Sequence, residues 1–403
     1  MRRADPRLLL IGAFIAAGIL ILDPFGLMRS GSSPARSELP AEHKARLVDW
    51  VEAEARAPEQ YLAKLFERRQ IVFLGEYGRI REQVELLTSA LELLHAAGVT
   101  RLGLVHLRVA DQTGIDRLIS ADEFDREQAA RLLFNRKVVW GYREYVDLLE
   151  AVWRMNREAP PTRSPMRVIG LGMRPDYYHL RSPPDLHDRR KMQSVFTEGV
   201  PDRVIADTIE REIIAPGHRA LIFTPIEHSF TRYEDRVYRE HLRRIGIPEN
   251  ERAGNYIYDQ IGDRAATVLL HSPWPDQGSS GGVASPADGA IEALIPLLPV
   301  ELRRGGIEVA TGPLSELPIG SSDYREHYDA LTLGELTDGY ILLGPIAEYR
   351  TVTALRGFIT AGNLETAIRY FPGPTPDGAT VTGMNAYLER ANDEVRRTLR
   401  MFR

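Results

Sequence analysis

The chain has 403 residues, of which 43% are hydrophobic and 27% are charged, so it has enough apolar side chains to bury at least one large core. Its 51 basic and 56 acidic residues give a net charge of -5, and we expect no nucleic-acid partner because the basic excess of such proteins is missing. The absence of cysteine excludes disulfides, thiolate zinc sites, iron–sulfur clusters and a cysteine nucleophile.

The N-terminal segment has the layout of a membrane-targeting sequence. Three arginines, at positions 2, 3 and 7, precede an uninterrupted apolar run over residues 8–22. We therefore predict that residues 1–28 are a signal anchor or a signal peptide. The anchor is favoured because no small-x-small cleavage site follows Leu22. Positively charged residues that flank a membrane span usually stay on its cytoplasmic side. We therefore expect a single-pass protein of the cell inner membrane, with its main domain extracytoplasmic (periplasmic).

Residues 29–41 are rich in Ser, Pro and Gly and are predicted to be a flexible linker. The remainder, 42–403, is predicted to be a single α/β domain. Its first part, 42–69, has the pattern of one or two amphipathic helices interrupted at Pro58.

Strand and helix signals then alternate, which predicts a mostly parallel central sheet flanked by helices on both faces. A typical helical signal is the spacing of Val84, Leu87, Leu91 and Leu94, which stops at Gly98. Residues 272–290 are rich in Gly, Ser and Pro and are predicted to be a mobile loop, and a helix is expected from about 384 to 400. The short apolar runs expected to be strands are Ile71 to Leu74, Leu102 to Val105, Arg167 to Leu171, Ala220 to Phe223, Thr267 to Leu270 and Tyr340 to Leu343.

Five of these strands are followed by ionisable side chains. Ligands of open parallel sheets bind beyond the carboxyl ends of the strands, so these side chains mark a candidate site if the strands are neighbours. Gly75 and Gly78 are expected to let the backbone approach a ligand there. The ionisable residues are Glu76, His106, Asp176, Glu227 with His228, and His271.

Several segments in order resemble one superfamily. The segments are "IVFLGEYGRIREQVELLTSALELLHAAGVTRLGL", "ADQTGIDRLI", "VVWGYREYVDLLEAVWRMN", "MRVIGLG", "ALIFTPIEHSFTRY" and "DGYILLGP", within residues 70–350. Together they resemble the group that contains erythromycin esterase-like hydrolases, ChaN-like haem-binding lipoproteins and Tiki/TraB-type proteins. The resemblance implies an α/β domain in which a Gly-Glu, a Glu and His residues at strand ends form the catalytic or metal-binding centre of hydrolase members.

Carried over residue by residue, Glu76 and His228 match that pattern. Gly78 stands where the first His of the family is expected, and His106 stands where the Glu of the second strand is expected. The chain is therefore expected to be a divergent member with a degenerate site. Its candidate catalytic residues are Glu76, His106 and His228.

Other interpretations of these residues stay open. Glu76 could cap the following helix, and His106 could be a core imidazole. Asp176 is a candidate ligand-binding residue that could gate a pocket, and Arg232 could bind an anionic group. His271 is expected to be structural, and core packing is favoured for the aromatic run at positions 140, 142, 145 and 153.

Three functions follow from these expectations. We favour the binding of a small molecule, haem or another planar ligand, at the carboxyl edge of the sheet. His228 or His106 would hold this ligand, and the catalytic site would be degenerate. The first alternative is a metal-assisted ester or amide hydrolase that uses Glu76, His106 and His228, with a divalent metal such as zinc or manganese. The second is a non-catalytic interaction scaffold.

Overall fold

The computed structural model describes residues 39–403 except 181–184, 186–187, 249–250, 278–281 and 373–376. The predicted anchor at 1–28 and most of the predicted linker lie outside these described residues. Within the described part of the chain, every helix is too short or too polar to cross a bilayer.

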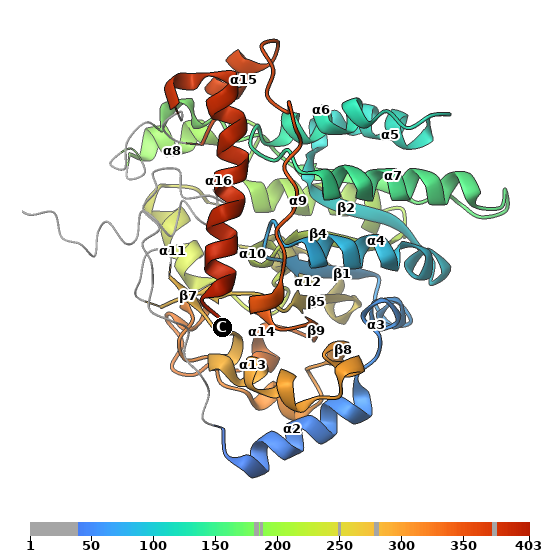
Figure 1. Cartoon of the computed structure of the whole chain (residues 1–403), viewed down its shortest axis with the longest axis vertical. Coiled ribbons are helices and arrows are strands. Elements are labelled where there is room, and N and C mark those ends of the chain that lie inside the picture. Colours follow the sequence, from blue (N-terminus) through green and yellow to red (C-terminus); the bar gives the residue numbers. More distant parts are fainter. Residues whose placement is uncertain (1–38, 181–184, 186–187, 249–250, 278–281, 373–376) are drawn as a thin grey trace, which may run out of the picture.

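A seven-stranded sheet forms the centre of the molecule, in the order β3-β2-β4-β1-β5-β9-β8 (Figure 1). All neighbours are parallel except β8, which pairs antiparallel with β9. Each of the six predicted apolar runs lies in one of these strands, so the predicted α/β class is confirmed. The strands of this sheet are β1 (Ile71–Glu76), β2 (Val99–Arg108), β3 (Arg167–Gly172), β4 (Arg219–Pro225), β5 (Ala265–Leu270), β8 (Arg304–Glu308) and β9 (Gly339–Leu343).

Helices cover both faces of the sheet. Apolar side chains of α4, α7 and α16 pack on one face, and those of α9 and α12 pack on the other. The helices are α2 (Ala41–Glu54), α3 (Pro58–Leu65), α4 (Arg81–Ala96), α5 (Gln112–Ser120), α6 (Arg126–Arg136), α7 (Arg143–Glu158), α8 (Arg189–Val195), α9 (Pro201–Ile209), α10 (Ile226–Ser229), α11 (Arg236–Arg244), α12 (Ala253–Ile261), α13 (Ala290–Leu294), α14 (Leu333–Leu336), α15 (Leu364–Arg369) and α16 (Val381–Arg400).

The helix signals of the sequence are confirmed. The first helical stretch divides at Pro58, which begins α3 because proline is tolerated in the first turn of a helix. The spaced leucines lie on α4, and the chain leaves that helix at Gly98 with φ +85°, a left-handed conformation that favours glycine.

The predicted loop at 272–290 differs from the expectation. Its described part includes a short antiparallel pair, β6 (Trp274–Pro275) with β7 (Val283–Ala284), and Trp274 is fully buried. The carboxylate of Asp288 accepts hydrogen bonds from the backbone N–H groups of Gly320 and Ser321. Composition alone predicted a mobile loop, but the described part of the segment forms regular pairing and contacts with distant residues.

The alternation of side chains along β1 determines the face of the sheet to which Glu76 is directed. Successive side chains of a strand point to opposite faces of a sheet. In β1, Val72 and Leu74 pack with α4 and α7, whereas Ile71 and Phe73 pack with α9 and α12. Glu76 is two residues beyond Leu74, so its carboxylate is directed to the α4 and α7 face.

Candidate functional site

Glu76 and His106 form a buried hydrogen-bonded pair at the carboxyl edge of the sheet. The distance from Glu76 Oε1 to His106 Nε2 is 2.6 Å. Glu76 is 2% exposed and His106 is 6% exposed, so water screens the pair very little. Because a carboxylate only accepts hydrogen bonds, the Nε2–H of His106 is the donor, and in the neutral form of the ring the lone pair is on Nδ1.

The pair joins two strands that are not neighbours, because β4 lies between β1 and β2. Neighbouring strands are about 4.8 Å apart, so two side chains must reach across roughly twice that distance. The ring of Phe223, from β4, lies 5.6 Å from the His106 ring and packs on the same face. The two polar side chains therefore meet over the end of the intervening strand.

Glu76 does not cap the helix that follows it. Helix α4 begins at Arg81, and its N-cap position, Ile80, makes no side-chain capping bond. The second carboxylate oxygen of Glu76 instead accepts a hydrogen bond from Tyr145 OH at 3.1 Å. The capping interpretation is therefore wrong.

Tyr145 comes from α7, which covers this face of the sheet. Burial and the nearby Glu76 carboxylate raise the pKa of Tyr145 well above its usual value. The phenol therefore keeps its proton and remains a donor to Glu76. The core packing expected of the aromatic run is confirmed by burial for Trp140, Tyr142 and Tyr145, but two of these rings also surround the site.

Aromatic rings enclose the imidazole of His106. The ring of Tyr145 lies at 4.6 Å and that of Trp140 at 5.5 Å, measured between ring centroids. His106 Nδ1 is buried and has no hydrogen-bond partner among the described residues. A buried polar atom without a partner is uncommon in folded proteins, and this one is a basic nitrogen available for a ligand.

Two buried cations lie beside the same aromatic cluster. The Arg79 guanidinium carbon is 5.1 Å from the centroid of Trp140, and Lys137 Nζ is 5.3 Å from it. Burial, reinforced by the positive charges of Arg79 and Arg136, lowers the pKa of Lys137 well below its usual value. The sequence analysis did not single out either cation, because Arg79 and Lys137 both lie near other charged residues in the chain, and charged residues are ordinarily exposed.

His228 belongs to a different network. It lies on α10, directly after β4, and its Nδ1 is 2.7 Å from Asp202 Oδ1 on α9. Asp202 also accepts hydrogen bonds from Tyr238 OH at 2.8 Å and from the backbone N–H of Ala253 at 2.8 Å. The described contacts of His228 are therefore with the helices of the opposite face, and none joins it to Glu76 or His106.

The electrostatics of this second network are strong. Burial alone would raise the pKa of Asp202, but His228, Arg252 and Tyr238 outweigh burial and hold it at about 2. The neighbouring Glu227 shows the opposite behaviour, because burial raises its pKa. Groups with opposed pKa shifts at one sheet edge are typical of acid–base sites, although structural ion networks produce them too.

The structure does not bring two other predicted residues to the Glu76–His106 pair. Asp176 caps the short turn after β3 through Tyr178 N and forms an ion pair with Arg369 at 2.9 Å. Arg232 pairs with Asp338 at 3.0 Å, just before the start of β9, which is the opposite end of the strands. The chain after α10 turns back across the sheet, and this turn could not be predicted from the strand-end pattern.

The remaining predicted residues have local roles. His271 is fully buried with both ring nitrogens bonded, to Tyr340 OH at 2.9 Å and to Glu292 at 2.8 Å, as expected of a structural residue. A Cβ on Gly75 would lie 2.9 Å from Leu269 and from Ser229, so close packing of α10 and β5 requires this glycine. Gly78 lies half-buried in the turn between β1 and α4.

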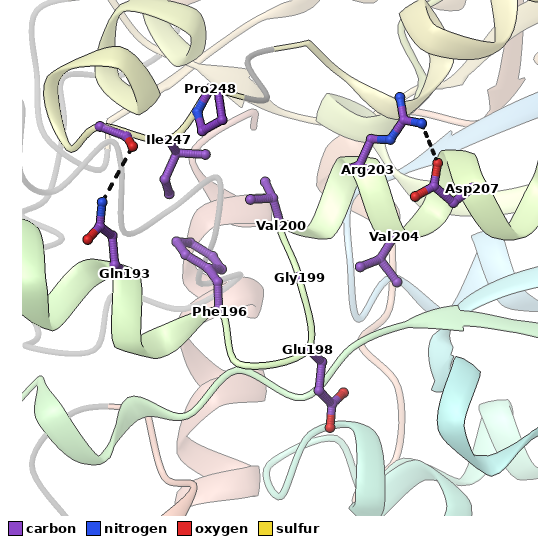
Figure 2. A pocket seen from close by; sticks show the side chains of 11 residues that line it. Gln193, Phe196, Glu198, Gly199, Val200, Arg203, Val204, Asp207, Ile247 and Pro248 are labelled. Atoms are coloured by element: carbon purple, nitrogen blue, oxygen red, sulfur yellow. Dashed lines mark hydrogen bonds and ion pairs between the residues drawn. The ribbon is translucent and has the colours of Figure 1, made fainter.

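Two surface cavities lie away from these residues. One, of about 430 Å³, lies between the start of α9 and the chain after α11 (Figure 2). The other, of about 620 Å³, lies between α2 and residues 310–316. None of Glu76, His106 and His228 lines either of these two cavities.

The donors do not fit a divalent metal. In the described part of the chain, no group of three or more His, Asp or Glu side chains is arranged to hold an ion. Glu76 and His106 direct their atoms at each other, and His228 directs Nδ1 at Asp202. We therefore derive no reaction step through a metal.

Comparisons with known proteins give similarity at the level of the fold. No family model matches the chain, and no curated protein matches it. A structure of a Bacillus cereus protein is 13% identical, with a TM-score of 0.48, covering 75% of this chain and 97% of its own. An erythromycin esterase mutant in its open conformation is 11% identical, with a TM-score of 0.45, covering 74% of this chain and 95% of its own.

A third solved structure that matches is ChaN of Campylobacter jejuni with cofacial haem. It is 15% identical, with a TM-score of 0.31, covering 53% of this chain and 84% of its own. The matching structures thus include members of two of the groups that the sequence resembles, the erythromycin esterases and ChaN.

Proposed function

We propose that the carboxyl edge of the sheet is an acid–base site for a small polar molecule, and that the chain hydrolyses an ester or an amide there. The observation that supports this proposal is the buried Glu76–His106 hydrogen bond together with the unpartnered Nδ1 of His106. A carboxylate that orients an imidazole and leaves its other nitrogen free is the arrangement of a general base.

The reaction follows from this arrangement. A water molecule gives a proton to His106 Nδ1 while its oxygen forms a bond to the carbonyl carbon of the substrate. The imidazolium that results is stabilised by the Glu76 carboxylate, which Tyr145 holds in place. The same proton then passes from Nδ1 to the leaving oxygen or nitrogen as the bond between it and the carbonyl carbon breaks.

The test is ester and amide hydrolysis by the full-length chain. We expect His106→Gln to lower kcat/KM by about 100-fold or more, which is the usual contribution of a general base. The control is His179→Gln, because His179 is exposed in the turn after β3. Unchanged activity in the His106 variant would contradict the proposal.

A second candidate is the binding of a haem-like molecule without reaction. The Asp202 carboxylate fixes Nδ1 of His228, and a carboxylate on one nitrogen typically orients the other nitrogen of the ring toward a metal or cofactor. Titration of the full-length chain with haem tests this candidate. A Soret shift that His228→Ala abolishes would support it, and a shift that survives both His228→Ala and His106→Ala would exclude axial ligation by these residues.

We also propose that residues 1–28 anchor the chain in the cell inner membrane, with the main domain periplasmic. The arginines ahead of the apolar run at 8–22 support this proposal. Cell fractionation of the full-length chain and protease treatment of spheroplasts test it. The chain should sediment with the inner membrane, and its main domain should be cleaved from outside; recovery in the cytosolic fraction would contradict the proposal.

A further inference from the structure

Lys137 is a buried cation without an anionic partner. It follows the last residue of α6, and only 7% of it is exposed. Among the described residues, its ammonium group makes no hydrogen bond or ion pair, and its contact is with the face of Trp140 at 5.3 Å. Burying a charge without a partner is costly, so such a lysine needs an explanation.

Arg79, in the turn after β1, is a second buried cation without an ion pair, although its side chain forms a hydrogen bond with Tyr142. It is 3% exposed, and its Nε and Nη2 are buried without hydrogen-bond partners among the described residues. Its guanidinium lies over the rings of Trp140 at 5.1 Å and Tyr142 at 5.5 Å. Two buried cations therefore share one indole ring.

The backbone of Arg79 adds an independent observation. Its φ is +72°, in the left-handed region that a residue with a side chain adopts at a cost. Hydrogen bonds of the chain at 350–352, including Val352 N to Arg79 O at 3.0 Å, hold this turn in place. Glycine would fit the turn more easily, so an arginine at this position carries a cost in backbone strain.

The two cations are close to the proposed reacting pair. The Trp140 ring that they share lies 5.5 Å from the ring of His106. The Glu76 oxygens are directed to His106 and Tyr145, so this carboxylate forms no ion pair with either cation. Glu227 attracts the charge of Lys137 from a distance, but no described carboxylate forms an ion pair with Lys137 or Arg79.

We propose that the molecule bound at this edge carries an anionic group, a carboxylate or a phosphate, and that Arg79 and Lys137 bind this group beside the Glu76–His106 pair. The proposal deepens the proposed function and rests on its site, although it does not require hydrolysis. The planar guanidinium suits two oxygens of such a group, and the ammonium adds a point charge.

The alternative is that both cations only stabilise the aromatic cluster through cation–π contacts. The two interpretations predict opposite effects on stability. If Lys137 stabilises the fold, Lys137→Met lowers the melting temperature. If the amine is kept for a ligand, the same change removes a buried polar group that has no partner in the unliganded chain, and it leaves the melting temperature unchanged or higher.

The binding test is calorimetric titration of the full-length chain with inorganic phosphate and, separately, with acetate. We expect saturable binding of at least one anion, weakened about tenfold or more in Lys137→Met and in Arg79→Gly. The second variant removes the charge and relieves the backbone at φ +72°. Lys64→Met, which removes an exposed lysine at the end of α3, should bind like the parent chain.

Two outcomes would overturn the inference: no saturable binding of either anion, or the same affinity in Lys137→Met as in the parent. A second assay separates this failure from failure of the proposed function, by comparing a neutral ester with the same ester carrying a carboxylate. Equal kcat/KM for both esters overturns the inference and leaves hydrolysis standing. Anion binding that Lys137→Met weakens, with no hydrolysis of either ester, supports the inference and contradicts the proposed function.

Discussion

Glu76 and His106 are joined at 2.6 Å across the end of β4, although they belong to strands that do not pair with each other. The contact needs three conditions: parallel strands, side chains directed to the same face, and an intervening strand that turns away at Pro225 into α10. These conditions place the hydrogen-bonded pair where ligands of open parallel sheets bind.

Removing the charge of Glu76 should impair the reaction. Glu76→Gln keeps the size of the side chain but no longer stabilises a positive charge on His106. We expect kcat/KM for ester hydrolysis to fall by about 100-fold or more. The matched control is Glu92→Gln on the exposed side of α4, for which activity should stay at the parent level. Equal activity of the two variants would show that Glu76 does not support catalysis.

The hydroxyl of Tyr145 should contribute measurably to stability. Tyr145→Phe keeps the ring contact with His106 and removes the buried hydrogen bond to the Glu76 carboxylate. We expect the free energy of unfolding to fall by about 1.5–3 kcal/mol, as for other hydrogen bonds to charged groups. The control is Tyr258→Phe, which removes an exposed hydrogen bond to Asp263. Chemical denaturation should show a smaller loss in the free energy of unfolding for this variant. A larger loss in the second variant would contradict the expectation.

Asp202 should make the chain sensitive to acid. Its pKa is about 2 in the folded chain and ordinarily 3.8, so its ionised form stabilises the fold above the ordinary value. This contribution, roughly 2 kcal/mol, is lost as the pH falls through about 2. Asp202→Asn removes this contribution and also leaves His228 and Arg252 without their buried anion.

Urea unfolding of the parent and Asp202→Asn chains at several pH values measures this effect. We expect the variant to be less stable near neutral pH, by about 3–5 kcal/mol, because one partner of a buried ion network is removed. The difference should narrow below about pH 4. A constant difference down to pH 2 would mean that the ionisation of Asp202 is not coupled to folding.

Asp323 should have the opposite dependence on pH. Burial, followed by the neighbouring carboxylates of Glu326, Asp276 and Asp235, raises its pKa to about 8. The folded chain therefore holds a proton that the unfolded chain releases near 3.8, and stability falls as the pH rises between these values. Asp323→Asn removes this loss, so it should stabilise the chain at pH 8 and have little effect at pH 4. Equal melting temperatures of parent and variant at pH 8 would contradict this expectation.

Local sequence was sufficient to single out two residues that the structure brings together, Glu76 and His106. Glu76 and His106 were found because each follows an apolar strand, and strand ends in α/β proteins are where ligands bind. The role of Tyr145 was not visible, because its spacing with Trp140 and Tyr142 is also that of core residues. Asp202 lies in the first turn of α9, where a carboxylate ordinarily favours the helix N-terminus, so nothing marked it as the partner of His228.

The sequence by itself determined the alternation of strands and helices, the burial of the central strands and the positions at which polar side chains end them. These properties depend on the period of the hydrophobic pattern over a few residues. The order of the strands, the pairing of Glu76 with His106 and the separate pairing of His228 with Asp202 were decided only by the tertiary structure. They depend on how whole helices and strands bury their apolar faces against one another, and that choice involves residues far apart in the chain.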